Sequence, residues 1–197
     1  MIPIYGAVLR LSSSSMRSDA KKNYEHLLEV GREVVAEQGA DASMRDVARR
    51  AEVGIGTLYR HFPSREALLE ALLRESFDEL TRKATALETS DSAGASLVSW
   101  LRDMVALTHG NRGVIASMTA AIAEPDSALH ASCVSMRASG ARLLERAQEA
   151  GQARRDIDGT DLLALVSALA WLNDQPPFAS RVERLFDLIA NAVLAEA

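Results

Sequence analysis

Apolar residues recur at steps of three and four along most of the chain, and no segment alternates with the two-residue period of a strand. The sequence therefore predicts an all-α protein. The longest regular stripe predicts a helix that Ser64 caps and that runs to about Glu88. Polar, glycine and proline breaks separate about nine helices, which we expect near residues 18–38, 43–51, 55–61, 64–88, 97–108, 113–123, 126–150, 158–172 and 178–193.

The segment SMRDVARRAEVGIGTLYRHFPSR, residues 43–65, has the pattern of two short helices joined by a tight turn. Ser43 is expected to cap the first helix, with Asp46 as its partner. The second helix, from about Ile55 to His61, is expected to end where a proline follows, because the residue before a proline is disfavoured in helical geometry. Such a pair has the form of a helix-turn-helix, whose second helix fits the major groove of DNA.

The charge is distributed unevenly along the chain. The net charge of −5 argues against a general nucleic-acid binder, but residues 16–66 hold nine basic and nine acidic residues, whereas residues 67–197 hold twelve and eighteen. Binding of DNA by the first part would need only a local basic face.

Sites for metals, cofactors and catalysis are not indicated. Cys133 is the only cysteine and the four histidines are scattered, so we expect no disulfide, no metal and no cofactor, in a cytoplasmic protein. No apolar run approaches the length of a membrane span, so no membrane partner is expected. The pair His130 and Cys133 lacks an orienting third group, and we expect no enzyme.

The run AEVGIGTLYRHFPSREALL resembles the DNA-binding signature of the tetracycline-repressor (TetR) family of bacterial transcription regulators. Residues from about Lys21 to Leu73 follow the pattern of that family's N-terminal domain. Three positions depart from it: Glu52 stands where a turn glycine is common, Gly54 where serine often caps the second helix, and Arg65 where lysine is usual. Glu52 predicts a strained turn, since a positive φ is disfavoured for residues other than glycine.

The resemblance implies an organisation in two domains. A three-helix helix-turn-helix domain is expected at residues 18–66, and the long helix after Ser64 joins it to a helical effector-binding and dimerisation domain at residues 67–197. Residues 1–17 are expected to be a disordered extension.

The implied partner is a double-stranded DNA operator. Tyr59 and His61 resemble the family's phosphate and groove contacts, while Arg60 could reach a guanine edge or a phosphate. Arg49 and Arg50 are more typical of an ordinary solvated helix face. The expected DNA-binding residues are Lys22, Ser43, Met44, Arg45, Ile55, Gly56, Thr57, Tyr59, Arg60, His61 and Arg65.

An unknown small-molecule effector is a further implication of the resemblance, which composition alone does not show. Methionine and tryptophan at helical spacing are more often plain core. The candidate effector-binding residues are Trp100, Met104, Leu107, Met118, Ile122, Cys133, Met136, Trp171 and Asn173. His109 could supply a second polar anchor beside Asn173.

A homodimer is expected because the helix around residues 162–172 is apolar on most of its circumference, which a monomer of this size covers with difficulty. In the family, the last two helices pair with their symmetry mates in a four-helix bundle. The candidate dimerisation residues are Leu162, Leu165, Leu169, Val182, Phe186 and Ile189.

The function expected from the sequence is that of a repressor that an effector releases from DNA. Two alternatives remain open. One is a helical small-molecule-binding or enzymatic module whose helix-turn-helix is vestigial, and the other is an activator on the same fold.

Overall fold

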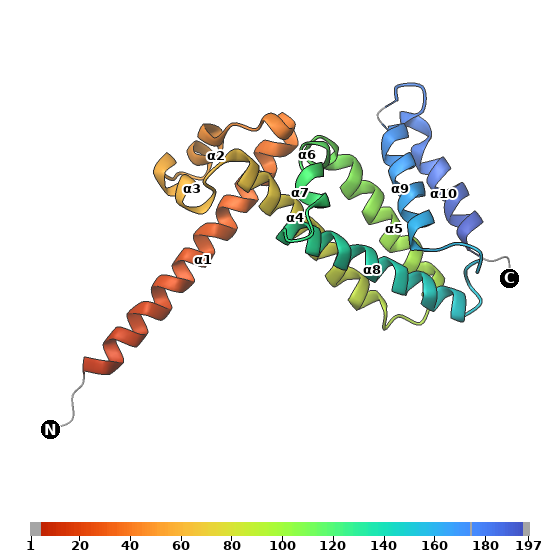
Figure 1. Ribbon diagram of the computed structural model, residues 1–197, viewed down its shortest axis with the longest axis horizontal. Coiled ribbons are helices and arrows are strands. Elements are labelled where there is room, and N and C mark those ends of the chain that lie inside the picture. Colours follow the sequence, from red (N-terminus) through yellow and green to blue (C-terminus); the bar gives the residue numbers. More distant parts are fainter. Residues whose placement is uncertain (1–4, 174, 195–197) are drawn as a thin grey trace. The chain divides into compact units, whose positions relative to one another are not determined.

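The structure, a computed structural model, describes residues 5–173 and 175–194, with side chains from Ala20 onward. The described residues form helices and no strand, which confirms the all-α prediction (Figure 1). The α-helices are α1 (Tyr5–Gln38), α2 (Met44–Arg50), α3 (Ile55–His61), α4 (Arg65–Leu87), α5 (Ala93–Gly110), α6 (Arg112–Ser117), α7 (Thr119–Ala123), α8 (Ala128–Glu149), α9 (Gly159–Asn173) and α10 (Val182–Val193), with 3-10 helices η1 (Gly39–Asp41) and η2 (Ala179–Arg181).

The chain divides between Leu72 and Leu73 into two compact units, so α4 contributes its first residues to unit 1 and the remainder to unit 2. In unit 1, α2 packs against α1 and α3. The core of unit 1 is apolar and includes Leu27, Val34, Val47, Leu58, Phe62 and Leu68. Gly31 lets α1 approach α4 closely, since a Cβ there would lie 3.1 Å from a methyl carbon of Leu68.

The predicted helix ends of unit 1 are largely confirmed. The Ser43 hydroxyl accepts a hydrogen bond of 3.3 Å from the amide of Asp46, and the Ser64 hydroxyl accepts one of 3.1 Å from the amide of Ala67. Gly39 ends α1 with a φ of +68°, which glycine adopts without strain.

The predicted start of α1 near residue 18 is too late, because the helix already begins at Tyr5. Residues 1–4 of the predicted disordered extension lie outside the described residues, whereas residues 5–17 have a helical backbone. Extending an existing helix costs less than nucleating one, so a serine-rich stretch without proline can join α1.

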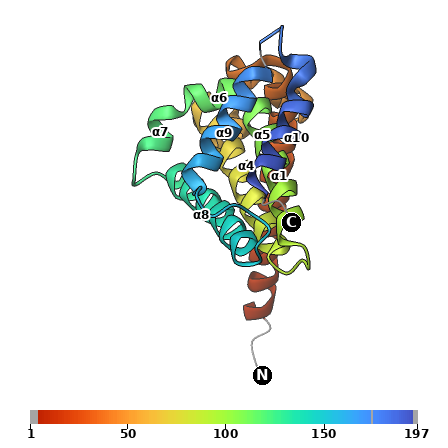
Figure 2. The same cartoon turned by 90° about the vertical axis from the view of Figure 1, so that its right-hand side faces the viewer.

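Unit 2 is built around α5, which packs against α8 and α9. Helices α9 and α10 lie side by side (Figure 2). The helix predicted at residues 113–123 is two helices, α6 and α7, and α5 is longer than predicted because Ser92 caps it earlier.

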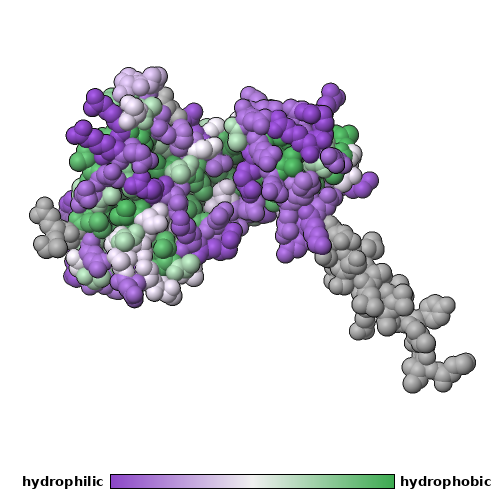
Figure 3. Space-filling model, turned by 180° about the vertical axis from the view of Figure 1, so that it is seen from behind, coloured by the Kyte–Doolittle hydropathy of each residue, from purple (hydrophilic) through white to green (hydrophobic). Residues whose placement is uncertain are grey.

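Figure 3 shows apolar residues exposed among hydrophilic ones on the surface of unit 2. The described helices contain no segment with the length and hydropathy needed to span a membrane.

Candidate functional site

Helix α3 presents one apolar side chain inward and a mixed set outward. Leu58 is fully buried and anchors the helix in the core of unit 1. The apolar Ile55 and the largely apolar Tyr59 are 41% and 46% exposed, and Arg60 is also exposed. Exposed apolar side chains on a short helix with a cation beside them are suited to contacts with thymine methyl groups and phosphates.

The structure brings several predicted DNA-binding residues of unit 1 together. Lys22 from α1 and Thr57, Arg60 and His61 from α3 line one open groove. Asn23 and His26 of α1 line it too. Sequence reasoning missed His26, and the signal that could have found it is its three-residue spacing from Asn23.

The position of His61 is fixed by an aromatic cluster. Its ring lies 6.0 Å from that of Tyr24 and 6.4 Å from that of Phe62, and the rings of Tyr24 and Phe62 are 5.2 Å apart. Tyr24 thus joins α1 to the end of α3. His61 is half-buried, so it borders the groove and does not project from it.

The turn before α3 is strained, as predicted. Glu52 has a φ of +55°, in the left-handed region that costs a residue with a Cβ about 1–2 kcal/mol. Gly54 precedes α3 without a side-chain cap. Its carbonyl accepts hydrogen bonds from the amides of Thr57 and Leu58 instead.

Two predicted DNA-binding residues have structural roles. Met44 is only 7% exposed and packs in the core of unit 1, because it lies on the same face of α2 as Val47 and Ala48. The Ser43 hydroxyl is engaged in capping α2. Arg45 is exposed, and so is Gly56 at the start of α3.

The arginines that end α2 pair with acidic residues of the same unit. Arg50 donates to Glu37 at 2.7 Å, and this hydrogen bond lowers the pKa of the Glu37 carboxyl. Arg49 pairs with Asp46 at 3.0 Å. The pKa of Asp46 is lowered first by a hydrogen bond from Gln38 and then by Arg49. These pairs agree with an ordinary solvated face.

Arg65 connects two segments of unit 1. Its guanidinium lies 3.5 Å from the Asp41 carboxylate of η1 and 3.5 Å from that of Glu66. Its Nε is buried without a hydrogen-bond partner in the described part of the chain. A phosphate contact by Arg65 therefore competes with two carboxylates.

The candidate effector-binding residues of unit 2 separate into three groups. Trp100, Met104, Met118, Cys133 and Met136 are buried, and Leu107, Ile122 and Asn173 are half-buried. Burial raises the pKa of the Cys133 thiol, which disfavours a thiolate nucleophile. Trp171 is 59% exposed on α9, so it does not join the buried group.

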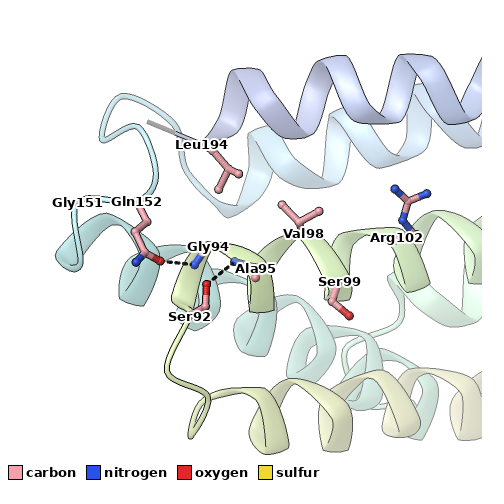
Figure 4. A pocket seen from close by; sticks show the side chains of 9 residues that line it. All are labelled: Ser92, Gly94, Ala95, Val98, Ser99, Arg102, Gly151, Gln152 and Leu194. Atoms are coloured by element: carbon pink, nitrogen blue, oxygen red, sulfur yellow. Dashed lines mark hydrogen bonds between the residues drawn. The ribbon is translucent and has the colours of Figure 1, made fainter. Parts of the chain in front are cut away.

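Two hollows open along α5. The larger, of about 670 Å³, is lined by residues of α5, the turn after α8 and the end of α10 (Figure 4). The smaller, of about 300 Å³, contains both predicted polar anchors, His109 and Asn173. None of the other candidate effector-binding residues lines either of these two hollows. Among the described residues, no cluster of three or more metal-ligating side chains could hold a metal ion.

Most of the candidate dimerisation residues are unavailable to a second copy. Leu162, Leu169, Val182 and Phe186 are at most 7% exposed because they pack in the core of unit 2, while Leu165 and Ile189 are half-buried. Among the described residues of α9 and α10, the large apolar side chains that are exposed are Trp171 and Leu188, at 59% and 57%.

Two family models match the chain. One, described as "Bacterial regulatory proteins, tetR family", matches residues 27–72. The other, described as "Transcriptional regulator SbtR-like, C-terminal domain", matches residues 92–191. The first match contains the whole helix-turn-helix, and the second extends from the start of α5 into α10.

Solved structures agree over almost the whole chain. The TetR transcriptional regulator SCO0520 of Streptomyces coelicolor is 30% identical with a TM-score of 0.72, over 88% of this chain and 99% of that one. A TetR transcription regulatory protein of Mycobacterium vanbaalenii is 28% identical with a TM-score of 0.71, over 91% and 99%.

Curated relatives match a shorter part. The HTH-type transcriptional repressor KstR of Mycolicibacterium smegmatis is 37% identical over 75 residues, which is 37% of each protein. The chain spans between 35% and 55% of the length of the first curated relatives it matches.

Proposed function

This chain belongs to the TetR family of DNA-binding transcription regulators, and we propose that it is a repressor that a small molecule releases from its operator. The groove in which Lys22, Thr57 and Arg60 meet carries the proposal for DNA contact. Repression is supported by the similarity of its helix-turn-helix part to KstR, which is named a repressor.

In the proposed complex, α3 enters the major groove. Thr57 and Ile55 meet thymine methyl groups, and Arg60 contacts a guanine edge. The Tyr59 hydroxyl donates to a phosphate oxygen, and Lys22 neutralises a phosphate from α1.

We further propose that two copies pair through the outer faces of α9 and α10. Trp171 and Leu188 would form the centre of this contact, with the half-buried Leu165 and Ile189 beside them. A two-fold axis gives each half-site the same reading helix, and half-sites must then lie about one DNA turn, roughly 34 Å, or a multiple apart.

Effector control would act through α4. In unit 2, α4 is tied to α5 by the hydrogen bond from Trp100 to the Leu80 carbonyl and by the ion pair of Lys83 with Asp103. Arg146 of α8 donates to the carbonyl of Leu87 at its end. An effector that shifts α5 or α8 would move α4 and change operator affinity by roughly 5–150-fold, a typical coupling between sites.

Selection of bound sequences from random duplex DNA, followed by gel retardation, tests the proposal. Thr57→Ala and Tyr59→Phe should each weaken binding of the selected duplex about tenfold, which corresponds to the loss of roughly 1.4 kcal/mol of binding free energy. Arg49→Ala is the matched control, because Arg49 already pairs with Asp46, and it should bind nearly as the parent does. No enrichment of any sequence would contradict the proposal.

A further inference from the structure

Helices α5 and α10 are bridged by one arginine. Arg102 of α5 donates to Glu183 and, at 3.0 Å, to Asp187, both on α10. Its guanidinium carbon also lies 4.2 Å from the centre of the Phe186 ring. One cation is therefore held by two carboxylates and an aromatic face, which is the arrangement that binds organic cations.

The two hollows of unit 2 meet at this bridge. The residues of α5 that line the larger hollow precede Arg102 in sequence, those that line the smaller hollow follow it, and Arg102 lines both. In Figure 4 the side chains of Val98 and Arg102 rise from α5 into the space that Leu194 enters from the other side. The Arg102 side chain therefore has room to swing into the larger hollow.

The bridge has an excess of negative charge. Glu183 and Asp187 supply two carboxylates against the one guanidinium of Arg102. An anion entering here would have to take Arg102 away from both carboxylates and leave them unpaired. A cation that takes the place of the Arg102 guanidinium keeps both carboxylates paired.

The smaller hollow combines apolar walls with this charge. Phe186, Val182, Val105 and Ala106 supply apolar surface, and Glu183 stands at its border. Its volume of about 300 Å³ is at the lower end of the range for ligand pockets. Such a hollow suits a small ligand with one charged end.

From these contacts we infer that the smaller hollow binds a small organic monocation with an apolar or aromatic body. Its cationic group takes the place of the Arg102 guanidinium over Phe186, between Glu183 and Asp187, and its body lies against Val105 and Val182. Calling this ligand the effector rests on the proposed function. Its binding would release α5 from α10.

Isothermal titration calorimetry of the full chain without DNA tests this site, with benzyltrimethylammonium as the probe and phenylacetate as the matched anion. Benzyltrimethylammonium should bind and phenylacetate should not. Glu183→Gln should weaken the cation about fivefold, the upper range for a surface ion pair. Arg102→Gln should strengthen it, because the competing guanidinium is gone, whereas Arg102→Lys should leave it near the parent value.

The matched control is Glu149→Gln, an exposed carboxylate of α8 away from the bridge, which should not change the affinity. Circular dichroism melting shows whether each variant is folded. Absence of cation binding up to about 10 mM, or weaker binding by the folded Arg102→Gln variant, overturns the inference. If the protein binds its selected DNA but not the cation, only the inference of a cation site is contradicted. If it binds the cation but no DNA, only the proposed function is contradicted.

Discussion

The indole nitrogen of Trp100 donates a hydrogen bond of 2.9 Å to the backbone carbonyl of Leu80, which fixes α5 against the second half of α4. The same indole faces Gly140 of α8 so closely that a Cβ there would lie 2.3 Å from a ring carbon. Three helices of unit 2 therefore meet at one buried side chain.

Gly140→Ala should destabilise unit 2 by about 1–3 kcal/mol, because the buried indole cannot move aside without overpacking the core. Gly110→Ala at the end of α5 is the matched control, since a Cβ there meets no atom within 4 Å. Chemical denaturation measures both. Equal midpoints for the two variants would contradict the packing at Trp100.

Glu52→Gly should stabilise the protein by about 1 kcal/mol, because glycine adopts a φ of +55° without the cost that a Cβ brings. Glu52→Ala keeps the Cβ and should leave the thermal midpoint nearly unchanged. A lower midpoint for the glycine variant would show that the turn is not strained.

Acid should weaken unit 1 through Asp46. The pKa of this carboxyl is lowered in the folded protein, chiefly by the 2.8 Å hydrogen bond from Gln38. A lowered pKa contributes stability above the unfolded pKa, and this stability is lost as the pH falls through the folded value. Thermal melting between pH 6 and pH 3 should therefore be less pH-dependent for Asp46→Asn. A parent-like slope for Asp46→Asn would refute the assignment.

Leu188→Glu should convert a dimer to folded monomers, because this side chain is 57% exposed in the single chain and a charge there would be desolvated in the dimer. Leu169→Glu should instead unfold unit 2, since Leu169 is 2% exposed. Light scattering and circular dichroism distinguish the two results. A Leu188→Glu variant that remains dimeric places the contact elsewhere.

Local signals in the sequence predicted much of the fold. Ser43, Ser64 and Gly39 act within one helical turn, so their roles could be predicted from neighbouring residues. The outward face of α3 followed from the inward position of Leu58 for the same reason.

Long-range relationships could not be predicted in this way. The spacing of Phe186 in α10 shows that it is apolar, but only the packing of α9 and α5 decides that it faces the chain's own core and not a second copy. Arg102 and Asp187 meet across 85 positions, and nothing local indicates their pairing. Met44 is buried on the face of α2 that also carries Val47 and Ala48, and helical spacing alone does not show whether such a face meets the protein core or DNA.

The salt dependence of operator binding tests the central claim, that α1 and α3 present a phosphate-binding groove, most directly. The logarithm of the association constant should fall linearly with the logarithm of salt concentration, by about 0.9 for each neutralised phosphate. Lys22→Gln should make this slope shallower by about one unit, while Arg49→Gln should leave it unchanged. A flat response of the parent protein, or equal slopes for the parent and Lys22→Gln, would contradict the account.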